Sequence, residues 1–259
     1  MKRYIWISLL AGILLSFCRA IDLALFTDLA TGLCTVGSVW WRYIAAAIAA
    51  ILALGCGQLA DHNPAALTRR HPATGFVAFV GGLCYSGAGV IRALSGSGGS
   101  GTMIQVALEI LCGFWLMCLW ASWQPVRFRP PTKSVLRGIA GSALFYWQVL
   151  ACFVQNSSSW HRVIPTSAVW QQLAALLFIT SLIRALYLPK QANGAALVRD
   201  GLLAFSLCFC WQLPQLTATL MAGQLSAADL VAGMGMCAVG LLGGVCAAIS
   251  TRGRQHRRA

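Results

Sequence analysis

The chain has 259 residues, of which 58% are hydrophobic and only 10% are charged. Soluble domains carry about 25% charged residues, so this composition excludes an ordinary water-soluble globular protein. The net charge of +13 does not indicate nucleic-acid binding, because the basic residues lie in short segments between apolar stretches, with no folded basic surface to carry them.

The apolar stretches set the fold class. A stretch of about 20 apolar residues crosses the ~30 Å hydrocarbon core of a bilayer as a helix. We therefore expect an all-α fold, a polytopic transmembrane bundle of about eight spans that forms one integral-membrane domain over residues 1–259. The expected spans are residues 4–26, 43–60, 73–94, 103–123, 139–156, 170–188, 201–224 and 227–250.

The first span is the least regular. Its clean apolar run, from Tyr4 to Cys18, has 15 residues and would form only about 22 Å of helix. The helix must therefore continue through Arg19 and Asp22, which lie three positions apart on one face, where an ion pair can form. The run also resembles a signal peptide, but Phe17 directly before Cys18 fits a lipobox poorly, so we expect an uncleaved helix.

The segment from Phe26 to Tyr43 joins the first two spans and is semi-apolar. It is too apolar to extend freely into water, and two interpretations stay open: a lid folded over the bundle, or an ordinary interfacial loop. Cys34, within it, is the one candidate for exposed thiol chemistry. Most of the eleven cysteines lie inside apolar runs, where cysteine behaves as a small hydrophobic residue.

Lys and Arg residues define the expected orientation, because they concentrate in cytoplasmic loops. One set of termini and alternate loops holds Lys2, Arg3, Arg69, Arg70, Arg127, Arg129, Lys133, Arg137, Lys190, Arg199, Arg252, Arg254, Arg257 and Arg258. The opposite set holds only Arg19, Arg42, Arg92 and Arg162, and Arg184 lies near the inner end of the sixth span. Both termini are therefore expected in the cytoplasm, in a multi-pass protein of a bacterial inner or plasma membrane.

Polar side chains recur at helical spacing within three spans, and residues three or four apart share a helix face. The stripes are Gln105, Glu109 and Cys112 in the fourth span, Gln148, Cys152 and Gln155 in the fifth, and Cys208, Gln212, Gln215 and Thr219 in the seventh. Each stripe should face away from lipid. Given the expected orientation, the stripes converge on the outer half of the bilayer.

An ionised Glu109 inside a span is costly, by at least ~2.5 kcal/mol, so it must be paired with an arginine, solvated in a cavity, or protonated. A cavity with few polar groups and aromatic walls is typical of a small-molecule site. The candidate ligand-binding residues are Glu109, Gln105, Gln148, Gln212, Gln215, Trp147, Trp211, Arg19 and Arg92. The alternative is that the glutamines only hydrogen-bond one helix to another, each contributing about 0.6 kcal/mol.

Two further features concern the last spans. Pro214, in the middle of the seventh span, removes a backbone hydrogen bond and should kink the helix. A broken helix at mid-depth often lines a binding site. Gly240 and Gly244 form the small-residue pattern of close helix packing, which indicates intramolecular packing, with dimerisation as the alternative.

No catalytic or metal-binding constellation occurs within a span, since all four histidines lie in expected loops or tails. We therefore expect no enzyme, no metal and no cofactor. The hypothesis is a small-molecule transporter or a membrane-embedded substrate-binding component. It lacks a Walker motif, so an ATP-driven step would need a partner ATPase or other membrane partner. The alternative is a non-transporting sensor, accessory or assembly protein, with the lipid bilayer as its only certain partner.

Overall fold

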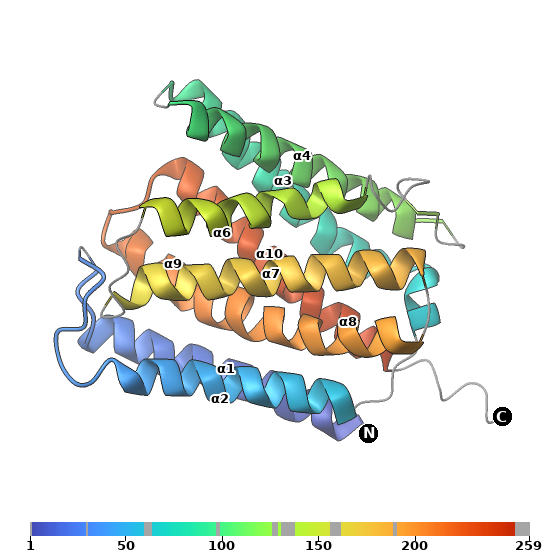
Figure 1. Ribbon diagram of the computed structural model, residues 1–259, viewed down its shortest axis with the longest axis horizontal. Helices are drawn as coiled ribbons and strands as arrows, with labels where there is room; N and C mark the ends of the chain where they lie inside the picture. The colour runs from blue at the N-terminus through green and yellow to red at the C-terminus, as the bar shows by residue number, and fades with distance from the viewer. Residues whose placement is uncertain are drawn as a thin grey trace.

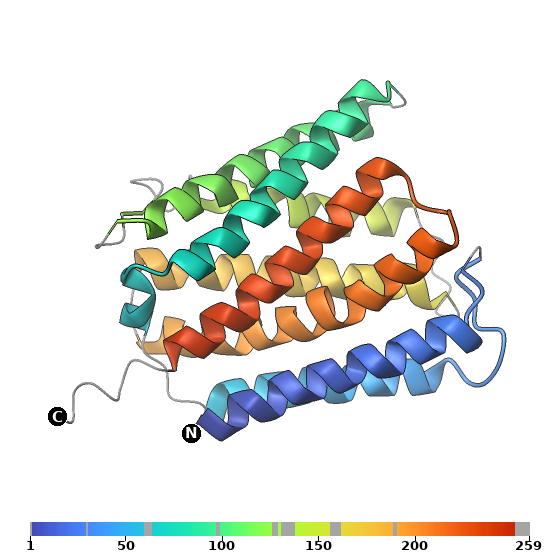
Figure 2. The same ribbon diagram turned by 180° about the vertical axis from the view of Figure 1, so that it is seen from behind.

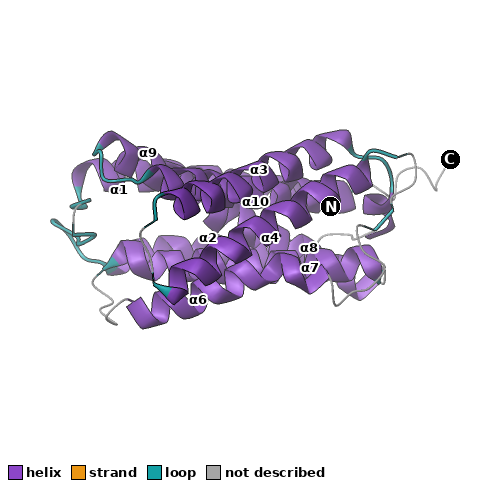
Figure 3. Ribbon diagram, turned by 90° about the horizontal axis from the view of Figure 1, so that it is seen from above, coloured by secondary structure: helices purple, strands orange, loops and turns teal. Residues whose placement is uncertain are grey.

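A computed structural model describes residues 2–29, 31–59, 64–96, 99–125, 129–130, 138–155, 162–188 and 191–251. These residues form a bundle of long helices (Figure 1). The described part of the chain contains no strand (Figure 3), and isolated bridges join Thr27 with Cys34 and Leu33 with Arg162. The expected all-α helical bundle is therefore confirmed.

The long helices are α1 (Lys2–Leu25), α2 (Trp40–Leu59), α3 (Pro72–Leu94), α4 (Ser100–Trp123), α6 (Ala143–Gln155), α7 (Val163–Tyr187), α8 (Gln191–Ala204), α9 (Gln212–Met221) and α10 (Ala227–Ser250). Short 3₁₀ turns, η1 (Pro64–Thr68) and η2 (Ala140–Ser142), precede α3 and α6. A π-helical segment, η3 (Phe205–Trp211), joins α8 to α9 without a break.

Seven segments of the described chain are long and apolar enough to cross a membrane, and the continuous segment Asn193–Met221 is one of them. An eighth apolar helix, Ala140–Val154, is shorter. The start of α1 and the end of α10 lie at the same end of the bundle (Figures 1 and 2), which fits an even number of crossings. The protein is therefore a multi-pass membrane protein.

We call the end of the bundle that holds the start of α1 the inner end, and the opposite end the outer end. The assignment of the inner end to the cytoplasm remains a prediction from the charge bias. Several of the basic residues behind that prediction lie outside the described residues: Arg127, Lys133, Arg137, Lys190, Arg252, Arg254, Arg257 and Arg258. Residues 60 and 156, the expected ends of two spans, lie outside them as well.

Two helix boundaries differ from the expected ones by several residues. Helix α7 begins at Val163 rather than at residue 170, because Pro165 falls in its first turn, where no backbone N–H needs an intrahelical acceptor. Helix α8 begins at Gln191 rather than at residue 201. Arg199 and Asp200, which resemble loop residues in the sequence, pair with each other inside this helix at 2.9 Å.

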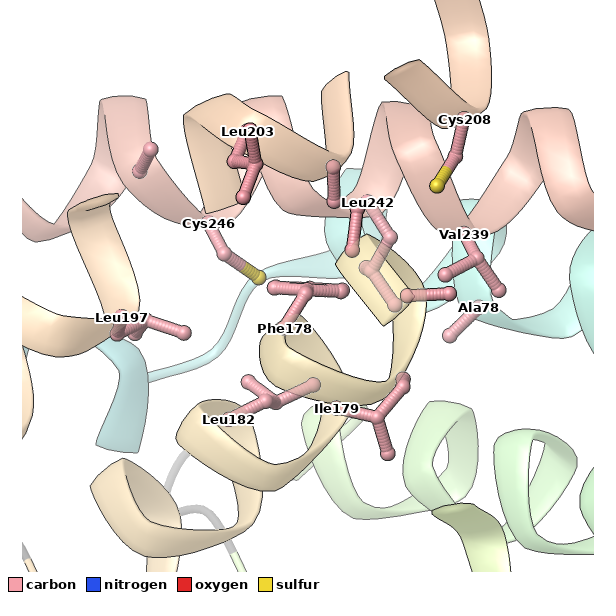
Figure 4. Close-up of a cluster of buried hydrophobic side chains, with 14 of the residues drawn as sticks. Ala78, Phe178, Ile179, Leu182, Leu197, Leu203, Cys208, Val239, Leu242 and Cys246 are labelled. Carbon is pink, nitrogen blue, oxygen red and sulfur yellow. The ribbon is translucent and has the colours of Figure 1, made fainter. Parts of the chain in front are cut away.

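The centre of the bundle is the continuous segment α8–η3–α9, which contacts α1, α2, α7 and α10. Figure 4 shows Phe178 and Leu182 of α7 pointing toward Leu242 and Cys246 of α10, with Leu203 of α8 beside them. All are buried. Such close apolar contacts, rather than exclusion from water, hold helices together in lipid.

Glycines let helix backbones approach each other closely. A Cβ atom built on Gly113 of α4 would lie 2.6 Å from the carbonyl oxygen of Gly82 on α3. A Cβ atom on Gly240 of α10 would lie 2.5 Å from the backbone nitrogen of Phe209 in η3, and Gly244 packs on the ring of Phe205. The expected intramolecular role of Gly240 and Gly244 is therefore confirmed.

The irregularity expected at Pro214 lies one turn earlier in the chain, in the π-helical segment η3. Proline lacks an N–H donor and its ring crowds the carbonyl of the residue four positions before it. A π turn widens the helix at that carbonyl and removes the crowding. The amide of Gln171 on α7 then donates to the carbonyl oxygen of Leu207 at 3.1 Å, which satisfies one acceptor of the widened segment.

Candidate functional site

Two cavities lie in the outer half of the bundle. The first, here called the polar cavity, has a volume of about 190 Å³ and lies among α3, α4, α6, α7, α9 and α10. Its lining consists of Tyr85, Arg92, Gln105, Gln148, Ala168, Gln171, Gln172, Gln212, Gln215, Asp229, Ala232, Gly233 and Met236. One or two glutamines from each of the three expected polar stripes thus meet in this cavity, whereas Cys112, Cys152, Cys208 and Thr219 do not line it. Of these stripes, the side chain of Gln155 lies outside the described residues.

Arg92 organises the charges at this cavity. Its Nη2 atom lies 3.3 Å from Glu109 Oε1 and 3.0 Å from Asp229 Oδ1, so it links α3 to both α4 and α10. Gln105 donates a second hydrogen bond to Glu109 Oε1 at 3.0 Å. Glu109 is fully buried and lies behind the lining, whereas Asp229 is 55% exposed. Glu109 is thus paired with an arginine, one of the three states that the sequence allowed.

Besides Gln105 and Gln212, four glutamines line the polar cavity, and they divide into two groups. Gln171 acts between helices, as described above, and its own carbonyl accepts from the Cys208 thiol at 3.2 Å. By contrast, the side-chain oxygens of Gln148, Gln172 and Gln215 are buried without a hydrogen-bond partner. An amide oxygen buried without a partner is costly, and none of these three oxygens makes the helix-to-helix bond that the alternative interpretation expects.

The hydroxyl of Tyr85 adds to this set, because it too is buried without a partner at the cavity. The ring itself is fixed, since it packs edge-on against Phe145 with centroids 5.8 Å apart. Three amide oxygens can accept hydrogen bonds, and the phenol can donate or accept one. The charged groups at this cavity are one arginine and two carboxylates, which gives a formal excess of one negative charge.

The second cavity, here called the apolar cavity, has a volume of about 350 Å³ and lies between α1 and α2 below the segment that joins them. Its lining consists of Leu15, Cys18, Arg19, Ile21, Asp22, Phe26, Val36, Gly37, Ser38, Trp41, Arg42, Ala45 and Trp211. Most of these side chains are apolar. The charged ones form a single cluster at the outer end of α1 and α2.

Asp22 is the centre of that cluster. It lies 2.5 Å from Arg19 on its own helix and 2.5 Å from Arg42 on α2. The ion pair expected between Arg19 and Asp22 is therefore confirmed. The guanidinium of Arg19 also lies over the Trp211 ring, with its central carbon 4.5 Å from the centroid, a cation–π contact. The Nε and Nη2 atoms of Arg19 are buried and have no hydrogen-bond partner.

The segment between α1 and α2 covers the apolar cavity. Arg42 holds it in place by donating to the carbonyl oxygen of Phe26 at 3.1 Å, and its Nη1 atom lies 2.6 Å from Cys34 Sγ. Gly37 has a positive φ of 82°, which only glycine adopts without strain, and lets the segment turn over the cavity. The lid interpretation of the sequence fits this placement, but the lid lies over the apolar cavity and not over Glu109.

The nine predicted ligand-binding residues therefore do not form one site. Gln105, Gln148, Gln212, Gln215 and Arg92 line the polar cavity, and Glu109 lies directly behind it. Arg19 and Trp211 line the apolar cavity instead. Trp147 lines neither of the two and is half-buried beside the start of α4.

Sequence reasoning missed four polar residues of the polar cavity: Tyr85, Gln171, Gln172 and Asp229. Gln171 and Gln172 are adjacent and form no stripe at helical spacing, although two neighbouring glutamines at the outer start of a span are a usable signal. Asp229 lies in the first turn of α10, where Ser226 caps its backbone N–H at 3.1 Å. An acidic residue there fits the helix dipole, so it gave no sign of a further role.

A third polar cluster lies toward the inner end. Asp200 of α8 is buried and accepts a hydrogen bond from Ser181 of α7, and Arg199 pairs with its other oxygen. Both carboxylate oxygens are thereby used. Neither described cavity reaches this cluster, which acts as a link between α7 and α8.

Comparison with protein-family models, with curated proteins and with solved structures gives no match for this chain. The function is therefore argued from the two cavities alone.

Proposed function

We propose that this protein binds a small polar solute in the polar cavity, as a small-molecule transporter or as the membrane-embedded substrate-binding component of one. The observation that carries the proposal is the set of buried, unpartnered amide oxygens of Gln148, Gln172 and Gln215 around one cavity. A solute that donates hydrogen bonds would satisfy them, and membrane-buried polar groups of this kind commonly mark substrate pathways.

The size and charge of the cavity narrow the solute class. A volume of about 190 Å³ is below the ~300 Å³ at which pockets for drug-sized ligands begin, so the solute has few heavy atoms. The excess of acceptors, together with the second carboxylate at Asp229, favours a neutral or cationic molecule with several N–H or O–H groups. Small amino compounds and polyols fit this description.

The proposal assigns no catalytic role, because the described linings of the two cavities contain no histidine and no nucleophile beside a general base. It also leaves the energy source to a partner: with no nucleotide-binding motif in the chain, an ATP-driven cycle requires a separate ATPase. Placement in a plasma or bacterial inner membrane, with the cavity facing outward, belongs to the same proposal.

Thermal stabilisation of the purified protein by a panel of small amino compounds, polyols, nucleosides and vitamins tests this proposal. Ala232 lines the cavity from α10, whereas Met234, two residues later, is exposed on the bundle surface. We expect a panel member to raise the melting temperature of the wild type and of Met234→Phe, and Ala232→Phe to abolish the shift. An undiminished shift in Ala232→Phe contradicts the proposal.

The competing function, a non-transporting protein whose glutamines only stabilise the bundle, predicts a cavity closed to water. A cysteine at position 232 distinguishes the two, with the unsubstituted chain as the baseline for native thiols. Labelling of Ala232→Cys from the outer side by a membrane-impermeant thiol reagent, slowed by the stabilising solute, supports solute binding in a cavity that is open to the outside. Absence of labelling, together with no stabilising solute, supports the competing function.

A further inference from the structure

The apolar cavity lies at a surface of the bundle that we expect to face the bilayer. Ile21 on α1 and Trp41 on α2 line it and are 56% and 72% exposed on the outside of the bundle. Large apolar side chains with that exposure in a membrane protein contact lipid chains. The outer end of the cavity is closed by the segment between the two helices, through Val36, Gly37 and Ser38. A molecule already dissolved in the bilayer therefore has the direct route into it.

The charges inside this cavity favour an anion. Arg19 and Arg42 face a single carboxylate, Asp22, which leaves a formal excess of one positive charge. Arg42 uses its donors on Asp22, Phe26 and Ser38. Arg19 is only 2% exposed, and two of its guanidinium nitrogens have no acceptor. Unsatisfied donors at this depth are costly, which points to an acceptor that the protein does not itself provide.

The two properties together describe an amphiphile. The wall formed by Leu15, Cys18 and Ala45 is apolar and runs inward from the charges along α1 and α2, as an acyl chain would. The charges lie at the outer helix ends, at the level of a lipid head group, and Trp41 lies beside them where tryptophan favours the interface. Guanidinium groups bind phosphate oxygens with paired hydrogen bonds.

We propose that the apolar cavity is a binding site for an anionic lipid of the surrounding bilayer, whose phosphate is held by Arg19 and whose acyl chain lies along α1 and α2. The site is separate from the polar cavity and favours the opposite charge. The proposal does not depend on the transport function. Under this proposal, α1 and α2 form the part of the lipid-contacting surface that prefers anionic lipids.

The test compares lipids of identical chains on the purified full chain in detergent, by native mass spectrometry and by melting temperature. We expect phosphatidylglycerol to bind about tenfold more tightly than phosphatidylcholine, because the two share the phosphate but the ammonium of choline cancels the net charge of the lipid and is repelled by the cationic site. Inorganic phosphate at the same concentration should give no shift. Equal binding of the two lipids overturns the proposal, and so does full competition by inorganic phosphate, which would indicate a soluble anion instead.

The net charge of +13 attracts anionic lipids to the whole surface, so the variants that test the site must leave the charge of the protein unchanged. Ala45→Phe fills the cavity from α2, and Ala47→Phe places the same ring on the exposed face of that helix. We expect Ala45→Phe to lose the preference for phosphatidylglycerol and Ala47→Phe to keep it. Cys18→Phe and Ala20→Phe repeat the comparison on α1, so that misfolding of one variant leaves the result decidable. Retention of the preference in Ala45→Phe or in Cys18→Phe overturns the site.

Discussion

Three arginines at the outer end of the bundle show how a cation is kept inside a membrane protein. Arg92 forms ion pairs with two carboxylates. Arg42 pairs with Asp22 and donates to backbone carbonyls, and Arg19 pairs with Asp22 and lies over the ring of Trp211. An unpaired charge in hydrocarbon costs several kcal/mol, so the pairs made by Arg92 and Arg42 act as fixed connections between helices, whereas Arg19 pairs with Asp22 on its own helix. Substituting one residue of a pair should therefore destabilise the protein more than substituting both.

That asymmetry gives a prediction for Arg92 and Glu109. Arg92→Gln leaves Glu109 buried without its cation and should destabilise the protein by roughly 3–5 kcal/mol. Adding Glu109→Gln removes the stranded carboxylate and should recover part of the loss. Melting temperatures in detergent for the wild type, both single variants and the double variant check this. A double variant that melts at the sum of the two single losses would show that the two side chains do not interact.

The helices are joined by contacts that depend on one or two atoms each. Gly82 lies against α4, where an added Cβ would meet the carbonyl oxygen of Gly113 at 2.7 Å, whereas an added Cβ on Gly87 would only touch Val231 at an ordinary 3.7 Å. Both glycines are on α3, and both have helical neighbours. They differ in the distance from the added Cβ atom to the neighbouring helix.

Gly82→Ala should therefore destabilise the bundle by about 1–3 kcal/mol, because α3 and α4 must separate to admit the methyl group. Gly87→Ala should be neutral or slightly stabilising, since alanine is the better helix former. The melting temperatures of the two variants, measured side by side, check the prediction. Equal effects at the two positions would mean that the close approach of α3 and α4 does not limit stability.

The π-helical segment supplies a second pair of matched substitutions. Gln171→Leu removes the donor to the Leu207 carbonyl and should cost about 1–3 kcal/mol, the price of a buried acceptor left unsatisfied. Gln172→Leu removes an amide whose oxygen has no partner and should cost less or stabilise the protein. Denaturation of both variants in detergent distinguishes them, and a larger loss for Gln172→Leu would refute the structural role of Gln171.

Hydropathy and spacing predicted most of this fold, for identifiable reasons. Span length follows from bilayer dimensions, and the stripe from Gln105 to Glu109 follows from helix geometry, so both can be read locally. Contacts between distant parts of the chain could not be read in that way. Arg92 and Asp229 are 137 positions apart, and Arg42 reaches Asp22 across a turn of irregular structure. The sequence therefore predicted one site where the structure has two cavities.

At the scale of the whole molecule, the property with the clearest test is whether the chain crosses the membrane an even or an odd number of times. Reporter proteins fused to the two ends of the chain should both report the cytoplasm, because α1 starts and α10 ends at the same end of the bundle and the basic residues favour that side. Activity of a periplasm-dependent reporter at either end would contradict the orientation. Reporters on opposite sides would contradict the eight-crossing bundle itself.

The apolar part of the α6 crossing, Ala140–Val154, covers only about 24 Å, against more than 30 Å for neighbours such as α4 and α7. A lipid sheet of uniform thickness cannot match both lengths, so it must thin on the α6 side, at a cost of a fraction of a kcal/mol for each ångström of mismatch. The polar cavity borders this helix through Gln148. Head groups and water are thereby drawn deeper next to the cavity than elsewhere around the protein, and bilayers of short-chain lipids should suit the molecule best.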